Sequence, residues 1–365
     1  MVAACAVALA GCGGGASSTR GLEPPKVDRP APPAGLFPDA SGKTLRQVLN
    51  ATDGPVGSLG LHLEPTAAVF YKGRNQFPIQ VTSDEAPVDS ADVALYLAKV
   101  PAPKPRNHLG KKGSLAQAQA QALDSSAQGP FPARVDTLAT DPQFTARSTM
   151  EDPRAATVVH VGSLDFPTDG EWRVGAVVRD GEETGSVVLP TVSVGEFDHI
   201  PKVGQRPPAI HTPTAASVGG DLKTISTRRP PSTMNKVAFA SALGREPILL
   251  VFASPRFSWN RTAGPTVDVA EQVGERFKHQ AAFINVEIYN DNDPGKGTRP
   301  QVRAFHLPSQ PWLFAINRQG RVVGEIEGAV GGAPRRAREQ SDLYRDIVDD
   351  RLVGLLEEAE AGTRV

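Results

Sequence analysis

The residues that could do chemistry gather in one loop, residues 254–265, which reads Ser-Pro-Arg-Phe-Ser-Trp-Asn-Arg-Thr-Ala-Gly-Pro. It follows a continuous apolar run at residues 248–252, which is typical of a buried strand, and it leads into a helical pattern. Ser258 is a possible nucleophile, for which His306 would be the base. No Gly-x-Ser-x-Gly elbow surrounds Ser258. Two solvated loop residues are the simpler interpretation, and hydrolysis stays an alternative.

A second candidate is the acidic stretch from Glu287 to Asp293, where oxygen ligands lie close together in the chain. A calcium loop needs a central glycine and a final glutamate, and this stretch has neither in place. A turn after a strand explains the acidic residues better. We therefore expect no metal and no cofactor.

The chain has only two cysteines, Cys5 and Cys12, and both lie in an apolar N-terminal stretch. The sequence Leu-Ala-Gly-Cys at residues 9–12 resembles the signal box of bacterial lipoproteins. This resemblance implies that residues 1–11 are removed as a signal peptide and that Cys12 carries a lipid. The protein would then be anchored on the extracytoplasmic face of the cell membrane, without a free thiol.

The N-terminus departs from this pattern, because no basic n-region precedes the apolar stretch. A start codon further upstream would account for that. The alternative is that the apolar N-terminus is simply buried. No later stretch is apolar for the roughly 18 residues that a membrane-spanning helix needs.

Composition shifts divide the remaining chain. The expected parts are a Gly/Ser/Pro-rich linker at 12–57, a β-rich domain at 58–203 with a basic insertion at 99–128, a second linker at 204–232, and an α/β domain at 233–365. The first linker would lift the domains off the membrane.

Apolar residues alternate along the β-rich domain, for example at Trp172, Val174, Ala176 and Val178. This period of two predicts half-buried antiparallel strands. The approach at residues 166–172 resembles a late strand of an immunoglobulin-like sandwich. No cysteine pair bridges the strands, so such a sandwich would be held by burial alone.

The second domain alternates strands and helices and then predicts a β-hairpin at residues 312–327 and a final helix at 335–360. This order, the Gly264-Pro265 pair and the segment before Trp312 resemble the thioredoxin-like family. By position, Pro311 would be the family's cis-proline, and an ordinary trans proline is the alternative. The combination is similar to actinobacterial envelope proteins that carry a sandwich ahead of a thioredoxin-like domain.

In that family the loop carries two cysteines that exchange disulfides, and here it carries none. One family template places the two cysteine positions on Ala263 and Thr266, and a longer template places them on Ser258 and Ala263. The resemblance further implies a groove that binds a partner peptide, formed by Phe257, Trp259, Gly264, Pro265, Gln310, Pro311 and Trp312. The aromatic residues Phe257, Trp259 and Trp312 either line that groove or belong to the core. For Trp312 we favour a place in the core.

The net charge of −1 argues against nucleic-acid binding. We expect a two-domain protein, an all-β immunoglobulin-like sandwich followed by an α/β thioredoxin-like domain. It would be a lipid-anchored, redox-inactive envelope protein that binds a protein partner or an unfolded peptide. The alternatives are an enzyme that works with a thiol-bearing partner and a structural adaptor between wall and membrane.

Overall fold

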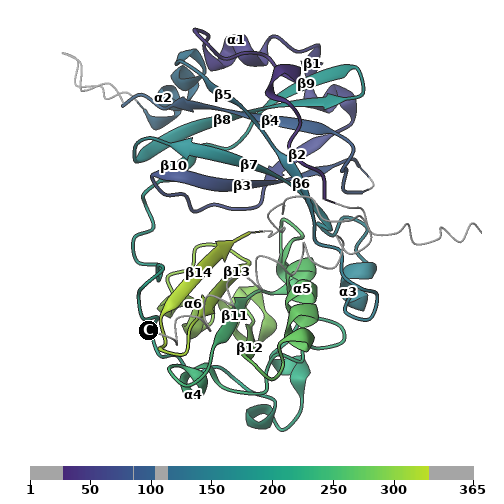
Figure 1. The fold of residues 1–365 in the computed structure, drawn as a ribbon, viewed down its shortest axis with the longest axis vertical. Coiled ribbons are helices and arrows are strands. Elements are labelled where there is room, and N and C mark those ends of the chain that lie inside the picture. The colour runs from purple at the N-terminus through teal and green to yellow at the C-terminus, as the bar shows by residue number, and fades with distance from the viewer. Residues whose placement is uncertain (1–27, 85, 103–113, 329–365) are drawn as a thin grey trace, which may run out of the picture.

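The protein is rich in β-structure. The structure, a computed structural model, describes residues 28–84, 86–102 and 114–328. These residues form three β-sheets and six α-helices, five of them with seven residues or fewer. Two of the sheets belong to the N-terminal half of the chain and the third to the C-terminal half (Figure 1).

The two N-terminal sheets are almost entirely antiparallel. The six-stranded sheet has the order β1 (Gly54–Pro55), β9 (Glu183–Val188), β8 (Gly170–Asp180), β4 (Asp92–Lys99) and β5 (Gln128–Pro132), with β10 (Val192–Val194) paired to β8. The four-stranded sheet has the order β2 (His62–Pro65), β3 (Gly73–Thr82), β7 (Val158–Phe166) and β6 (Arg134–Thr137). Only the short pair of β1 with β9 is parallel.

One apolar core joins these two sheets. The residues that alternate along β8, from Trp172 to Val178, lie in it together with Phe77 of β3 and Phe166 of β7. The rings of Phe166 and Trp172 meet edge to face, with centroids 5.8 Å apart. The alternation predicted for β8 is therefore confirmed, because every second side chain from Trp172 to Val178 faces this core. The prediction that the strand is half-buried is wrong, because Gly175 and Val177 between these residues are buried as well.

Residues 28–57 are folded, so the interpretation of residues 12–57 as a linker is wrong for this part. Helix α1 (Leu45–Leu49) begins at Thr44, whose hydroxyl accepts a hydrogen bond from the Gln47 backbone N–H at 3.2 Å. Its apolar side chains pack on the outer face of the six-stranded sheet. A capping box and three buried residues outweigh the proline-rich composition around them.

The insertion at residues 99–128 links two neighbouring strands, β4 and β5. It contains helix α2 (Leu115–Gln121), a run of alternating Ala and Gln after Leu115. Ser114 caps the helix through the Gln117 backbone N–H at 3.2 Å. Most of the basic residues of the insertion fall in 103–113, outside the described residues.

The third sheet combines parallel and antiparallel strands in the order β12 (Ala282–Val286), β11 (Ile248–Phe252), β13 (Trp312–Ile316) and β14 (Val322–Glu327). Strands β11 and β12 are parallel, whereas β13 runs antiparallel to both β11 and β14. The strand predicted at residues 248–252 is confirmed as β11, and the hairpin predicted at residues 312–327 is confirmed as β13 and β14. Strands β11 and β13 are buried along their whole length, which is why they read as continuous apolar runs.

Four helices accompany this half of the chain: α3 (Arg147–Met150), α4 (Phe239–Ala242), α5 (Ala263–Arg276) and α6 (Pro300–Ala304). Helix α3 comes from the N-terminal half but lies beside α5 (Figure 1). The core on the α5 side of the third sheet includes Leu138, Val159 and Val161 of the N-terminal half. The two halves therefore share buried apolar surface.

The segment at residues 204–232 is packed against the second half, so it is not a free linker. Ser232 donates a hydrogen bond to Glu271 of α5 at 2.7 Å. Arg228 forms an ion pair with Asp268 of α5 at 2.8 Å, and both side chains are almost fully buried. Buried polar groups need partners, and these contacts fix the segment in place.

Some expectations fall on residues that the structure does not describe. These are the signal peptide at 1–11, Cys12, and the final helix at 335–360. Among the described residues, no helix is long and apolar enough to cross a lipid bilayer.

Candidate functional site

The chemically interesting loop lies between β11 and α5. Ser254 follows β11, a short 3₁₀ turn covers Pro255–Phe257, and α5 begins at Ala263. Ser258 is buried, and its hydroxyl donates a hydrogen bond to the Asn260 side-chain oxygen at 2.8 Å. The same hydroxyl accepts the Ala263 backbone N–H at 3.2 Å. Ser258 thus satisfies a free N–H at the start of α5, as helix-capping residues do.

The three positions expected to match the family's cysteines are all buried. Ala263 is completely covered, and Ser258 and Thr266 are 6% and 2% exposed. The Thr266 hydroxyl has no hydrogen-bond partner among the described residues. The positions lie together at the start of α5 but are closed to solvent.

Helix α3 accounts for much of this cover. A Cβ atom added to Gly264 would lie 3.1 Å from the hydroxyl oxygen of Thr149 in α3. Close by, the Ala156 backbone N–H donates to the Arg261 carbonyl at 3.1 Å. The Arg261 guanidinium in turn donates to Asp152 at 2.9 Å. Residues 149–156 therefore close over the end of the loop.

Most of the predicted groove residues are buried as well. The Gln310 side chain forms two hydrogen bonds with the loop. It accepts one from the Ser254 backbone N–H at 2.7 Å and donates one to the Phe257 carbonyl at 3.1 Å. The Gln310–Pro311 peptide bond is cis, which confirms the prediction for Pro311. The Pro311 carbonyl accepts the Gly328 backbone N–H at 2.9 Å. These groups are engaged within the chain.

The aromatic residues of the predicted groove differ in exposure, so they divide between the core and the surface. Trp312 belongs to the core, at 2% exposure, and its indole N–H donates to the Ser309 hydroxyl at 3.0 Å. Phe257 is half-buried and packs edge to face on Tyr289, whereas Pro265 is buried. Trp259 is 66% exposed, and it is the one predicted groove residue that protrudes into solvent.

Ser258 and His306 do not form a nucleophile and base pair. The hydrogen bonds of the Ser258 hydroxyl go to Asn260 and Ala263, and His306 packs against His199 with ring centroids 5.5 Å apart. No hydrogen bond joins the two residues within the described part of the chain. The structure gives the hydrolytic alternative no support.

Glu287, considered above as a metal ligand, organises the loop instead. Its carboxylate accepts hydrogen bonds from the Ser254 hydroxyl and from the Thr227 hydroxyl, the latter at 2.9 Å. Burial raises the pKa of the Glu287 carboxyl above its ordinary value. Asp291 pairs with Lys296 at 3.1 Å. No cluster of three or more His, Cys, Asp or Glu suited to a metal occurs within residues 28–84, 86–102 and 114–328.

A groove that the sequence analysis missed lies beside the loop. It has a volume of about 1450 Å³ and runs between α3, the segment at residues 223–231 and the 3₁₀ turn at Pro255–Phe257. Its cationic lining residues are Arg147, Lys223, Arg228, Arg229, Arg256 and Arg261, and its acidic ones are Glu151, Asp152 and Asp291. We call it the arginine groove.

Sequence patterns could not reveal this groove. Its arginines come from three segments that are separated by dozens of residues, so no single stretch of sequence contains the groove. Arg256 and Arg261 are the two groove residues that lie within the loop of residues 254–265. Long-range folding brings the charges together.

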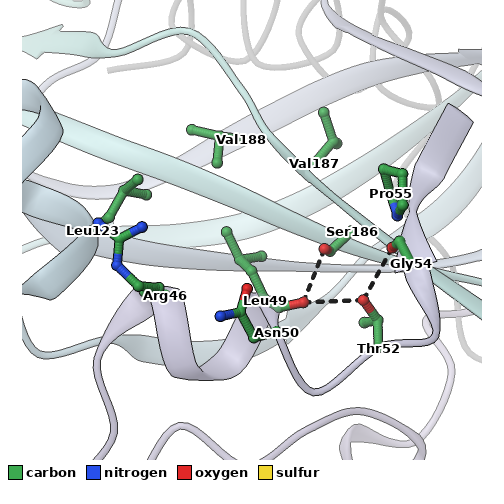
Figure 2. A pocket seen from close by; sticks show the side chains of 10 residues that line it. All are labelled: Arg46, Leu49, Asn50, Thr52, Gly54, Pro55, Leu123, Ser186, Val187 and Val188. Atoms are coloured by element: carbon green, nitrogen blue, oxygen red, sulfur yellow. Dashed lines mark hydrogen bonds between the residues drawn. The ribbon is translucent and has the colours of Figure 1, made fainter.

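Another pocket, of about 420 Å³, lies between α1 and β9 (Figure 2). The hydroxyl groups of Thr52 and Ser186 both donate to the Leu49 carbonyl at 2.9 Å. Arg46 at its edge pairs with Asp124 at 2.7 Å.

Comparison with known proteins adds no family. No protein-family model matches this sequence, and no curated protein matches it significantly.

Proposed function

We propose that this chain is a redox-inactive, thioredoxin-like binding protein of the cell envelope. In this proposal an immunoglobulin-like half precedes the thioredoxin-like half, and a lipid on Cys12 holds the protein at the membrane. The order of β11, α5, β12, the cis Gln310–Pro311 bond and the β13–β14 hairpin supports the thioredoxin-like assignment. The shared core of two β-sheets supports the sandwich assignment.

One observation carries the proposal for the loop. Ser258 occupies the first candidate cysteine position. Its hydroxyl accepts a hydrogen bond from the Ala263 backbone N–H and so caps the start of α5. Disulfide exchange needs an accessible thiolate. Here the loop has no sulfur, and its matching positions are buried beneath α3. The scaffold is therefore better suited to binding than to redox chemistry.

Trp259 is the exposed aromatic residue of the loop and can reach a partner. It borders a small pocket of about 150 Å³ whose other walls include Glu64, Arg154 and Arg261. Exposed tryptophan and arginine side chains are the residues that contribute most often to protein-protein binding. The binding surface of our proposal is thus centred on Trp259 and replaces the closed groove around Pro311.

The proposal is tested by site-specific photocrosslinking in the native envelope. A photoreactive amino acid at position 259 should give a discrete crosslinked product with a protein or peptide. The same amino acid at Val203, which is 61% exposed, is the control for accessibility and should not give that product. Identical products from both positions would contradict the proposal, as would disulfide reduction of insulin by the purified protein.

A further inference from the structure

We infer that the arginine groove binds an acidic peptide segment through its carboxylate groups. This inference rests on the proposed function, since it names the chemistry of the partner that the binding protein would hold. Arg261 connects the two surfaces, because it lines both the arginine groove and the pocket beside Trp259. A peptide in the groove would therefore extend toward Trp259.

The charge of the groove points to an anion. Six cationic and three acidic side chains line it, although the whole chain carries a net charge of −1. Arg228 is already neutralised by Asp268, and Asp291 by Lys296. Lys223 and Arg256 are exposed and have no acidic partner among the described residues. These two cations are available to a ligand.

The arginines are also positioned for carboxylates. Glu151 accepts a hydrogen bond from Arg147 at 2.7 Å and a second one from Arg229 at 2.6 Å. One carboxylate group thus already sits between two guanidinium groups on the groove wall. Guanidinium groups bind carboxylates in a planar, often two-pronged geometry. A carboxylate of a ligand can be held by Arg256 or shared with this pair in the same way.

The size and the apolar walls favour a peptide over a small anion. The groove, at about 1450 Å³, exceeds the roughly 300–1,000 Å³ of typical small-molecule sites. Pro230, Pro231 and Pro255 line it, and their rings offer apolar contacts between the charges. An extended acidic peptide can use both kinds of surface, whereas a polyphosphate chain can use only the cations.

The walls are firmly held, so the groove is formed before a ligand arrives. The Ser148 hydroxyl accepts the Arg229 backbone N–H at 3.3 Å, which ties α3 to the segment at residues 223–231. The Thr227 hydroxyl accepts the Arg256 backbone N–H at 3.2 Å, which ties that segment to the loop. Preformed sites lose less entropy on binding.

The test uses a fluorescein-labelled (Glu-Pro)5 peptide and the full chain, followed by fluorescence anisotropy. We expect saturable binding that weakens as salt is raised, and no binding of the uncharged (Gln-Pro)5 peptide. The double variant Lys223→Gln/Arg256→Gln should bind about tenfold more weakly, because two exposed charge contacts are lost. It should unfold like the native protein, since neither side chain has an acidic partner in the structure.

The matched control, Lys72→Gln/Arg318→Gln, removes two exposed positive charges outside the groove and should bind within about twofold of the native chain. Equal losses in both double variants would overturn the inference, as would equal binding of the two peptides. Binding of inorganic polyphosphate alone, without (Glu-Pro)5, would also overturn it. If the native chain does not bind (Glu-Pro)5 but crosslinks from position 259 persist in the Lys223→Gln/Arg256→Gln variant, the proposed function stands and only this inference is removed.

Discussion

The side-chain amide of Asn260 donates a hydrogen bond to the Thr66 carbonyl at 3.3 Å, across a separation of 194 residues. It joins the loop of the second half to the chain just after β2. Its oxygen meanwhile accepts from the hydroxyl groups of Ser258 and Thr262, at 2.8 and 2.7 Å. One buried asparagine thus connects the conformation of the loop to the position of the first half.

Replacing Ser258 with alanine should destabilise the protein by about 1 kcal/mol, because the buried N–H of Ala263 loses its cap. Urea unfolding measures the effect. Ser41→Ala, at an exposed serine, is the control and should change the free energy of unfolding by less than about 0.5 kcal/mol. An unchanged stability for Ser258→Ala would argue against the capping role.

Single cysteines at two adjacent positions should react very differently with a maleimide. In a background without Cys5 and Cys12, Ser258→Cys should react at least about tenfold more slowly than Trp259→Cys, because reaction at the buried site needs a local opening. The exposures of the native residues are 6% and 66%. Equal rates under native conditions would mean that α3 does not close the loop. Equal rates in urea serve as the control.

Replacing Arg228 should strongly destabilise the folded protein. Its guanidinium donates to Asp268 at 2.8 Å, to the Phe144 carbonyl at 2.6 Å and to the Pro230 carbonyl at 3.1 Å. Arg228→Met leaves the Asp268 carboxyl buried without its partner and should destabilise the protein by about 3–5 kcal/mol. The measurement is the midpoint of urea unfolding.

Two further variants test whether the destabilisation comes from the buried ion pair or from the loss of any arginine. Arg228→Met/Asp268→Leu removes both charges and should recover much of the lost stability. Arg147→Met breaks the exposed pair with Glu151 and should cost no more than about 1 kcal/mol. If Arg228→Met were as mild as Arg147→Met, the buried ion pair would not hold the segment at residues 204–232.

Glu325 should make stability depend on pH. Burial raises the pKa of its carboxyl from 4.5 to about 7, and one carboxyl oxygen lacks a hydrogen-bond partner among the described residues. Because the pKa is higher in the folded state, the protonated Glu325 carboxyl favours folding. Its contribution to the free energy of unfolding is complete below pH 4.5 and is lost as the pH rises through 7. Nearby Lys202 only partly offsets the burial.

The variant Glu325→Gln cannot titrate at this position. As the pH rises from 4.5 to 8, the variant should gain about 1 kcal/mol of stability relative to the native chain, because it has no carboxylate to bury. Solvent partly screens the side chain and keeps the gain at about this size. Thermal unfolding of both proteins across this range measures the difference. A difference that stays constant with pH would contradict the assigned pKa.

The local features of the second half could be predicted well from the sequence. The apolar runs of β11 and β13 gave their bounds, because strands buried on both sides leave no polar interruption. The position of Pro311 predicted its cis bond. In the first half, the alternation along β8 identified the face that packs against the other sheet.

The closing of the loop could not be predicted. The contact of Thr149 with Gly264 joins segments that carry no shared pattern, and α3 has only four residues. Residues 28–57 read as a linker because proline and glycine are frequent in them, although a capped helix of five residues is enough to bury Leu45 and Val48. Long-range packing decided both outcomes.

The core around α5 has a practical consequence for dividing this gene. Val159 and Val161 of β7 lie in the same apolar cluster as Leu249 and Val251 of β11. A fragment that ends at residue 232 would expose Leu138, Val159 and Val161 to water, and one that starts at 233 would expose the apolar side chains that these three residues cover. Each fragment would be prone to aggregate on expression, and the cloning boundary suggested by composition is therefore a poor one. The smallest unit to express should span both halves.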